Sequence, residues 1–261
     1  MLSFVKEISD HKTALFTLVT VNLKTSVFST RLGVVWWIAD PIIMMSIYYF
    51  MVRIIFNRGG ENYHLFALCG IVAWQFFSRA LKSSSRSITS NKAMIQQIGL
   101  PVSVLIGVPV VVQMFFAIIG FCIVIVWSYS TLSITTIAII PLLLLIALIS
   151  YSLSIYLSMC EVIFRDTNQI VGYILRLGFF LTPILYPVTR VTESESIPAI
   201  IELVFQLNPF AWIIPSIRNV LLNQVMFDWC VYVVISSLTL AAIQIGLLLL
   251  RWQTPKLSKM I

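Results

Sequence analysis

The sequence has little charge. Asp, Glu, Lys and Arg make up 10% of its 261 residues, against roughly 25% in soluble domains, and 59% of the residues are hydrophobic. The mean hydropathy is +0.99. A soluble fold has too little interior to bury so much apolar surface. The composition therefore excludes a soluble globular domain or a disordered chain and predicts a polytopic membrane protein.

Metal-binding and catalytic motifs are also missing from the sequence. The four cysteines stand far apart in apolar runs, and His11 and His64 are isolated, so we expect neither a disulfide framework nor a metal site. The sequence has no G-x-x-x-x-G-K-[ST], G-x-S-x-G or H-E-x-x-H motif. We expect no enzyme activity and no cofactor in this chain. The charged first 32 residues also argue against a cleavable signal peptide.

Six segments are apolar enough to be expected as membrane spans, for which about 20 residues are needed. They are approximately Gly33–Phe56, Tyr63–Phe77, Val102–Trp127, Ile134–Cys160, Gln169–Tyr186 and Trp229–Leu250. The predicted fold class is an all-α polytopic membrane protein. Its transmembrane domain would cover residues 33–252, between an N-terminal segment, 1–32, and a tail, 253–261.

The distribution of basic residues predicts the orientation of these spans. Twelve of the 17 Lys and Arg residues fall in the N-terminal segment, in the gaps after the second and fourth spans, and in the tail. The positive-inside rule then places both termini in the cytoplasm. The net charge of +7 fits a basic face near anionic lipid rather than nucleic-acid binding.

Three segments outside the spans have patterns of their own. Residues 11–30 place threonines and Lys24 on one stripe, which predicts an amphipathic interface helix, with a short soluble helix as the alternative. Lys82–Leu100 is rich in serine and basic residues and ends at Gly99. It predicts a cytoplasmic helix with an exposed apolar edge for docking a partner, or else a solvated loop.

The third segment lies before the last span. Two apolar stretches, Ile197–Leu207 and Phe210–Leu222, flank an Asn208-Pro209 break, and each is too short to cross a bilayer. They predict a pair of external re-entrant half-helices that form a gate, or a surface hairpin without a gating role.

Two charges fall inside predicted spans, where charge is costly and usually functional. Asp40 and Arg176 sit at similar depths, so they could pair with each other, or Arg176 could contact an anionic head group. Asp166, with Gln169 three residues later, predicts a capping box at the start of the fifth span. The many aromatic residues in the spans could pack against sugar rings along a channel, or simply pack against lipid and other helices.

Several ordered motifs together resemble one family. Arg31-Leu32-Gly33 precedes the first span, Gly99-Leu100-Pro101 follows the second, and Phe164-Arg165-Asp166 follows the fourth. Leu181–Pro187 and Leu207-Asn208-Pro209 come later. Together they resemble type-2 ABC exporter permeases for polysaccharides, from about residue 11 to residue 252.

The resemblance implies a transporter subunit of the bacterial inner membrane. Such permeases form homodimers, pair with two separate subunits that bind ATP and Mg, and export lipid-linked glycans. Undecaprenyl-pyrophosphate-linked O-antigen is the leading expected substrate. The alternative functions are, in order, a capsule or teichoic-acid exporter permease, a small-molecule efflux permease and a membrane lipid-sugar enzyme.

The resemblance and the patterns above together nominate four groups of residues. The head-group candidates are Lys24, Arg31, Leu32, Gly33 and Arg176. The channel-lining candidates are Trp36, Trp37, Asp40, Tyr48, Tyr49, Phe76, Phe77 and Tyr151. The ATPase-coupling candidates are Arg86, Ile88, Asn91, Met94, Arg165 and Asp166. The external-gate candidates are Tyr186, Pro187, Asn208 and Pro209.

Overall fold

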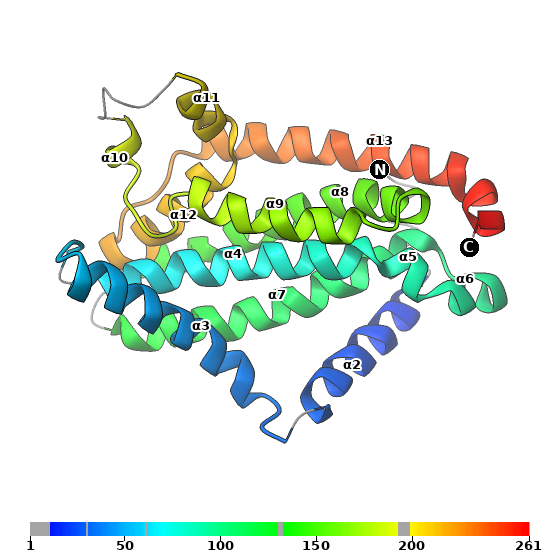
Figure 1. Cartoon of the computed structure of the whole chain (residues 1–261), viewed down its shortest axis with the longest axis horizontal. Helices are drawn as coiled ribbons and strands as arrows, with labels where there is room; N and C mark the ends of the chain where they lie inside the picture. Colours follow the sequence, from blue (N-terminus) through cyan, green and yellow to red (C-terminus); the bar gives the residue numbers. More distant parts are fainter. Residues whose placement is uncertain (1–10, 30, 61, 130–132, 193–198, 261) are drawn as a thin grey trace.

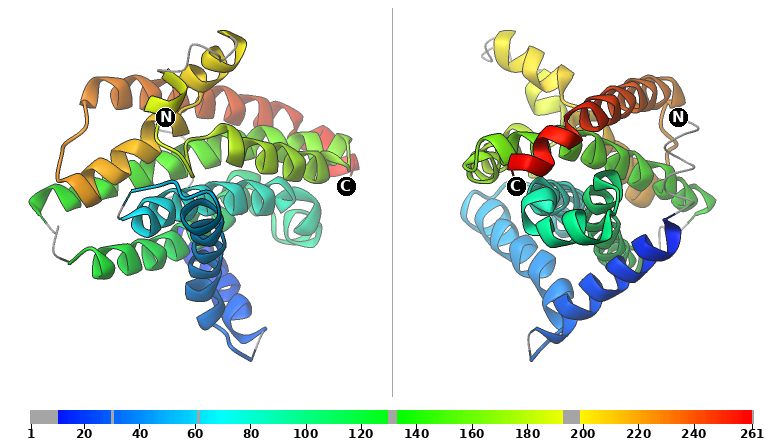
Figure 2. Two further views of the ribbon diagram at one scale, coloured as in Figure 1. Left: turned by 60° about the vertical axis from the view of Figure 1, so that its left-hand side comes forward. Right: turned by 90° about the vertical axis from the view of Figure 1, so that its right-hand side faces the viewer.

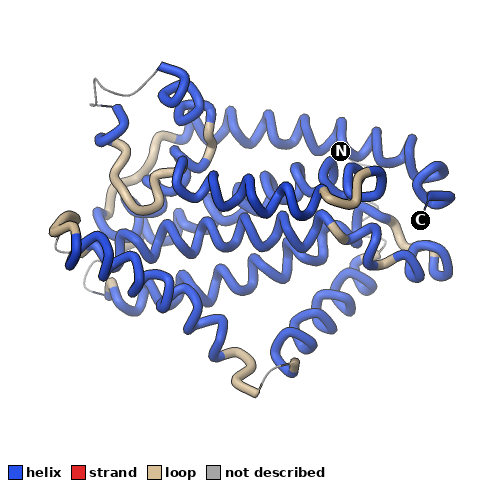
Figure 3. Tube along the Cα trace, viewed as in Figure 1, coloured by secondary structure: helices blue, strands red, loops and turns tan. Residues whose placement is uncertain are grey.

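The computed structural model describes residues 11–29, 31–60, 62–129, 133–192 and 199–260. Every regular element in these ranges is helical (Figure 3). The longest are α3 (Val35–Tyr49) with its π-helical continuation η1 (Phe50–Ile55), α4 (Tyr63–Ser85), α7 (Val102–Trp127), α8 (Ile139–Ile163) and α13 (Trp229–Met260). The 3-10 turn η3 (Ile134–Ala138) leads into α8. The predicted all-helical architecture is thus confirmed for the described residues.

Five helices in the described residues are long and apolar enough to cross a membrane. They are Val35–Ile55, Tyr63–Ser85, Val102–Trp127, Ile134–Ile163 and Trp229–Gln253. The second extends eight residues beyond its predicted end at Phe77. The expected fifth span contains α9 (Thr167–Leu181), whose 15 residues give a length of roughly 22 Å. That is shorter than the ~30 Å hydrocarbon core, so α9 alone does not meet the length of a span.

Helix α4 forms the centre of the packed core. It contacts α3, α7, α8, α9 and α12 (Phe210–Arg218) (Figures 1 and 2). Small residues let neighbouring helices approach its backbone, which is how helices associate in lipid. Ala67, Ala73 and Ala80 are completely buried, and Gly70 contacts Ile184 and Arg218.

Helix α2 (Lys12–Phe28) diverges from α3 and packs against α7 (Figure 1). Val19 is buried against Val108 and Val112 of α7. The outward side mixes threonines with exposed Phe16 and Phe28, so the amphipathic division is weaker than the sequence predicts.

The segment Lys82–Leu100 is not the single helix that we expected. Helix α4 runs on to Ser85, and two short helices follow, α5 (Ser87–Ser90) and α6 (Lys92–Ile98). Gly99 ends α6 with a φ of +67°, as the sequence predicts. Ile88 was expected on an exposed edge, but it is only 1% exposed because α5 packs on α7 and α8.

The segment before the last helix divides as predicted at Asn208-Pro209. Helix α11 (Ala199–Leu207) precedes the break, and α12 and the π-helical η4 (Asn219–Asn223) follow it. The first apolar stretch was predicted to start at Ile197, which lies outside the described residues. The short helix α10 (Thr189–Thr192) precedes α11 in the chain. Helix α12 packs against α4 and α8, with Ile213, Ile214 and Ile217 fully buried.

Candidate functional site: a cationic and aromatic groove

A groove of about 310 Å³ lies between α3, α4 and α9. Its walls thus come from the predicted first, second and fifth spans. One set of lining side chains is aromatic, namely Tyr48, Trp74, Phe179 and Phe180. Another is cationic, namely Arg79, Lys82 and Arg176.

The aromatic wall is built from three helices, α3, α4 and α9. Tyr48 of α3 stacks on Phe179 of α9, with ring centroids 5.3 Å apart. Gly178 lets α9 approach α4, since a Cβ there would lie 3.0 Å from the Trp74 ring. Tyr48 was a predicted channel-lining residue, and the structure places it in this groove.

The membrane carboxylate Asp40 is paired, but with a different residue from the one considered in the sequence. Its carboxylate accepts hydrogen bonds from the Arg79 guanidinium and from Gln75, whose Nε2 lies 2.9 Å away. The suggested Asp40–Arg176 pair is therefore wrong. Arg79 was overlooked as a partner because α4 was expected to end before it, at Phe77.

Arg176 extends from the exposed side of α9 into the groove. Its guanidinium carbon lies 5.6 Å from the centre of the Tyr173 ring. Lys82 reaches toward the same helix, with its Nζ 3.9 Å from the position of a Cβ on Gly172. Three cations therefore face the groove with one nearby carboxylate, Asp40. Charge in such a position favours an anion.

Other channel-lining candidates lie elsewhere. Trp36 is exposed on α3, Trp37 packs edge-on against Phe116, and Tyr49 lies near Tyr63. The remaining three, Phe76, Phe77 and Tyr151, are buried in the core. All three pack between helices, and the Tyr151 hydroxyl also donates a 3.1 Å hydrogen bond to the Ser103 carbonyl. Their buried positions argue against a place on a channel wall.

The head-group candidates other than Arg176 lie at or near the turn between α2 and α3, outside the groove. Lys24, Arg31 and Leu32 are exposed. Gly33 has a φ of +46°, and a Cβ there would lie 3.0 Å from the Val27 carbonyl oxygen. This turn therefore requires glycine.

A buried polar cluster joins the ends of α4, α8 and α9. The Glu161 carboxylate accepts a 2.7 Å hydrogen bond from the Asn168 backbone N–H and lies 3.8 Å from Nε of Arg86. Asn168 Nδ2 donates to the Lys82 carbonyl and to Ser85 Oγ, both at 2.7 Å. Glu161 therefore satisfies an N–H of the first turn of α9.

The remaining coupling candidates lie on α5–α6 and between α8 and α9. Asp166 occupies the N-cap position of α9, but its side chain makes no cap hydrogen bond, so the predicted capping box is wrong. Arg165 and Asp166 are exposed, and Asn91 and Met94 are partly buried on α5–α6.

The gate candidates connect the end of α9 to α12. Asn208 accepts a hydrogen bond from the Phe210 N–H (3.0 Å) and donates one to Thr182 (2.8 Å). The Tyr186 hydroxyl donates to the Phe180 carbonyl (3.0 Å). Pro209 is partly buried at the N-cap of α12, and Pro187 lines a second cavity beyond the groove.

Arg218 was not among the predicted site residues. It is 4% exposed, and its guanidinium donates to the carbonyls of Phe66 (3.0 Å), Pro183 (2.8 Å) and Ile184 (2.6 Å). It also lies 3.4 Å over the Phe66 ring. The predicted order of spans places Arg218 on the external side, before the last span. Its position inside the apolar stretch Phe210–Leu222 was the signal that it could be buried.

Composition and fold together define a multi-pass helical membrane protein. In the described residues no three His, Cys, Asp or Glu side chains gather where they could hold a metal ion. No family model matches the chain. Two O-antigen export system permease proteins RfbA of Klebsiella pneumoniae are similar to it. One is 30% identical over 206 residues, 77% of each chain, and the other is 29% identical over 79% of this chain and 77% of its own length.

A third relative, the O-antigen export system permease protein RfbA of Myxococcus xanthus, is 25% identical over 84% of each chain. The chain therefore belongs to the O-antigen export permeases, within the polysaccharide group of type-2 ABC exporter permeases. This confirms the family resemblance drawn from the sequence.

Proposed function

We propose that this chain is the permease subunit of an ATP-driven exporter that moves lipid-linked polysaccharide from the cytoplasmic to the periplasmic side of the inner membrane. The groove between α3, α4 and α9 carries the proposal. A lipid-linked glycan joined through a pyrophosphate diester presents two negative charges followed by sugar rings. The groove has three positive side chains and one negative neighbour, Asp40, so its net charge is +2, which suits the pyrophosphate. Its aromatic side chains offer flat faces to the sugars.

The leading substrate is undecaprenyl-pyrophosphate-linked O-antigen, because the curated relatives are named as O-antigen export permeases. Capsule or teichoic-acid precursors are the second candidate, since they combine the same phosphate and sugar chemistry. A small-molecule substrate has less use for a groove with this series of rings.

The working assembly in this proposal is a homodimer with two ATP-binding subunits. Helix α3 is largely uncovered by its own chain, which leaves an apolar face for a second copy beside the groove. Helix α9 and the turn that follows it make the sixth crossing, which puts both termini on one side, and the distribution of basic residues makes that side the cytoplasm. The partner subunits bind ATP and Mg, and this chain contributes α5–α6, Arg165 and Asp166 to their docking.

In the proposed cycle, Lys24 and Arg31 attract the pyrophosphate at the inner surface. ATP-driven closure of the partners pulls on α5–α6 and opens the seam between α3 and α9. The pyrophosphate then meets Arg79, Lys82 and Arg176, while the sugars slide over Tyr48 and Phe179. The lipid reorients with its head group.

Charge reversal at Arg176 tests the groove. Arg176→Glu, expressed in a deletion strain, should lower surface polysaccharide at least tenfold and cause lipid-linked glycan to accumulate inside the cell. The permease should still co-purify with its ATPase. Arg58→Glu, at an exposed arginine away from the groove, is the matched control and should export normally. Normal export by Arg176→Glu contradicts the proposed role of the groove.

Two further variants separate head-group capture from coupling. Arg31→Ala should abolish surface glycan with ATPase assembly intact, and normal export would exclude a head-group role. For coupling, Met94→Asp replaces a partly buried residue, because the buried Ile88 would disturb the fold when changed. It should reduce co-purification of the ATPase, whereas the exposed Met226→Asp should not. If the two variants co-purify the same amount of ATPase, the result contradicts docking at α6.

A further inference from the structure

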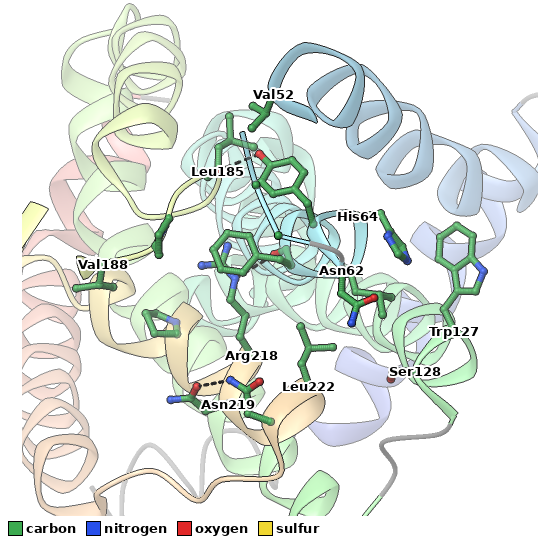
Figure 4. Close-up of a pocket in the computed structure, with 18 of the residues that line it drawn as sticks. Val52, Asn62, His64, Trp127, Ser128, Leu185, Val188, Arg218, Asn219 and Leu222 are labelled. Atoms are coloured by element: carbon green, nitrogen blue, oxygen red, sulfur yellow. Dashed lines mark hydrogen bonds between the residues drawn. The ribbon is translucent and has the colours of Figure 1, made fainter. Parts of the chain in front are cut away.

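A second cavity, of about 730 Å³, lies where α3 and α7 end and α4 begins. Figure 4 shows its lining residues, including His64, Trp127 and Asn219. The turn after α9 and the α12–η4 segment close another side. This end of the molecule is opposite α5, α6 and the C-terminal end of α13 (Figure 1). In the proposed orientation it faces the periplasm.

The lining side chains suit a carbohydrate. Asn62, Asn219 and Asn223 offer amide donors and acceptors of the kind that sugar hydroxyls need. The half-exposed Trp127 meets His64 edge-on, with ring centroids 6.0 Å apart, and its ring provides a flat apolar wall. Among the described lining residues there is no Asp or Glu. Arg190 and Arg218 are the charged groups among these described residues, and they suit neutral or anionic sugars.

The backbone around this cavity is irregular in a way that marks ligand sites. π-Helical segments are rare and are frequently found at functional sites. The described residues contain two, η1 and η4, and both contribute residues to this cavity. The non-glycine residues with positive φ in the same ranges are Asn57 (48°) and Gln224 (57°), just after those two segments. Such strain persists where the surrounding structure enforces it, as in ligand clamps.

Aromatic side chains of α3 lie beside both the groove and this cavity. In the groove, Phe179 stacks on Tyr48. Tyr49, which follows Tyr48 on α3, has its ring centroid 6.3 Å from that of His64. His64 in turn lies 6.0 Å from Trp127. Adjacent residues of α3 thus contribute a ring to the groove, at Tyr48, and a ring beside the cavity residue His64, at Tyr49.

We propose that this cavity is a glycan-binding site that holds a short segment of the exported polysaccharide as it emerges. Its volume falls within the roughly 300–1,000 Å³ range of small-ligand sites. The inference rests on the proposed export function, and it adds a site within each protomer, separate from the cationic groove. The site recognises sugar rings and hydroxyls, whereas the groove recognises the pyrophosphate.

Binding of lipid-free polysaccharide tests the proposal. The probe is the surface polysaccharide of the parent strain, released from its lipid by mild acid, and the protein is the permease–ATPase complex in nanodiscs. Isothermal titration calorimetry should show a Kd at least tenfold weaker for Trp127→Ala and at least threefold weaker for Asn223→Ala. Trp229→Ala is the matched control, because Trp229 and Trp127 are both 49% exposed. Its Kd should stay within twofold of wild type.

The groove variant separates the two proposals. Arg176→Glu should bind the lipid-free probe with an unchanged Kd while failing to export, because the probe has no pyrophosphate. If Trp127→Ala binds as tightly as wild type, the cavity proposal is overturned and the export function stands. If the wild-type complex does not bind the probe, the cavity proposal is overturned, and the export assay of Arg176→Glu decides the export function independently. Loss of a bound phospholipid from Trp127→Ala, seen by native mass spectrometry with an unchanged polysaccharide Kd, assigns the cavity to lipid and overturns the proposal.

Discussion

Helices α3 and α4 are neighbours of similar length, yet the chain surrounds them very differently. Of the most apolar stretch of each helix, 72% is buried in α4 and only 11% in α3 with its η1 continuation. Helix α3 presents Ile38, Ile43 and Ile47 to the outside, at one edge of the molecule (Figure 2). Helix α4 has neighbours on almost every side.

The less apolar of these two helices is the more buried one. Both helices carry large aliphatic and aromatic side chains, but α4 has many more small residues, including Ala67, Gly70 and Ala73, and more polar ones. In lipid, helices associate through close packing and polar contacts, because apolar surface gains little by leaving lipid tails. Burial therefore follows small and polar residues here. The exposed face of α3 is left for lipid or for a second copy of the chain.

The largest expected effect concerns the polar anchor of α4. Arg218→Ala removes three hydrogen bonds from a buried guanidinium to the carbonyls of Phe66, Pro183 and Ile184. It should destabilise the chain by about 3–5 kcal/mol, because those carbonyls lose their charged partner. The apparent Tm of the purified complex should fall clearly, while Arg176→Ala on the exposed side of α9 should leave it almost unchanged. Equal Tm values for wild type and Arg218→Ala would show that α12 does not depend on this arginine.

A smaller effect is expected at the glycine that makes room for Arg218. A Cβ on Gly70 would lie 2.8 Å from Nη2 of Arg218 and 3.1 Å from the Ile184 carbonyl oxygen. Gly70→Ala should therefore cost about 2 kcal/mol, in the range of overpacked cores. Gly107→Ala is the control, since its Cβ would make only an ordinary contact with Tyr151 at 3.6 Å. If both variants unfold at the same temperature, the close approach at Gly70 is not tight.

Apolar runs in the sequence predict well where the long helices begin. They predict poorly where α4 ends and which residues contact each other. Five of the six predicted segments begin within two residues of a helix that can cross a membrane by length and composition, and only the segment from Gln169 does not. Apolar runs reveal such helices because the bilayer imposes a length. The end of α4 was misjudged because Ser78 to Ser85 is polar, although buried contacts such as Ser84 to the Ile106 carbonyl keep it helical.

The partners of charged residues could not be read from the sequence. Asp40 and Arg176 have matching depths, but depth gives no information on which helices touch, and Arg79 on the adjacent α4 makes the pair. Glu161 rather than Asp166 accepts the hydrogen bond at the start of α9. That contact depends on how α8 turns into α9. By contrast, Tyr48 and Arg176 were assigned to the substrate path from local chemistry, and both line one groove.

A direct test of the difference between the two helices compares two aliphatic residues. Leu68 on α4 is 1% exposed and Ile43 on α3 is 48% exposed. Leu68→Ala should cost about 1–2 kcal/mol, the part of a core truncation that comes from the cavity left behind. Ile43→Ala should change stability by less than about 0.5 kcal/mol. Thermal unfolding measures both, and a similar loss at Ile43 would show that α3 is covered as firmly as α4.

The smallest stability effect, and the most informative for function, is expected where α3 and α4 meet. Asp40 and Arg79 form an ion pair whose side chains are 44% and 41% exposed, so the pair contributes up to about 1 kcal/mol. Asp40→Lys or Arg79→Glu should each lower the Tm slightly, and the double reversal should restore it. Export distinguishes two roles for Arg79. If Arg79 only positions α3, the double reversal restores surface glycan as well. If it also binds the pyrophosphate, as we propose, the Tm recovers while export stays low, because a carboxylate then stands on α4 where the anion must pass.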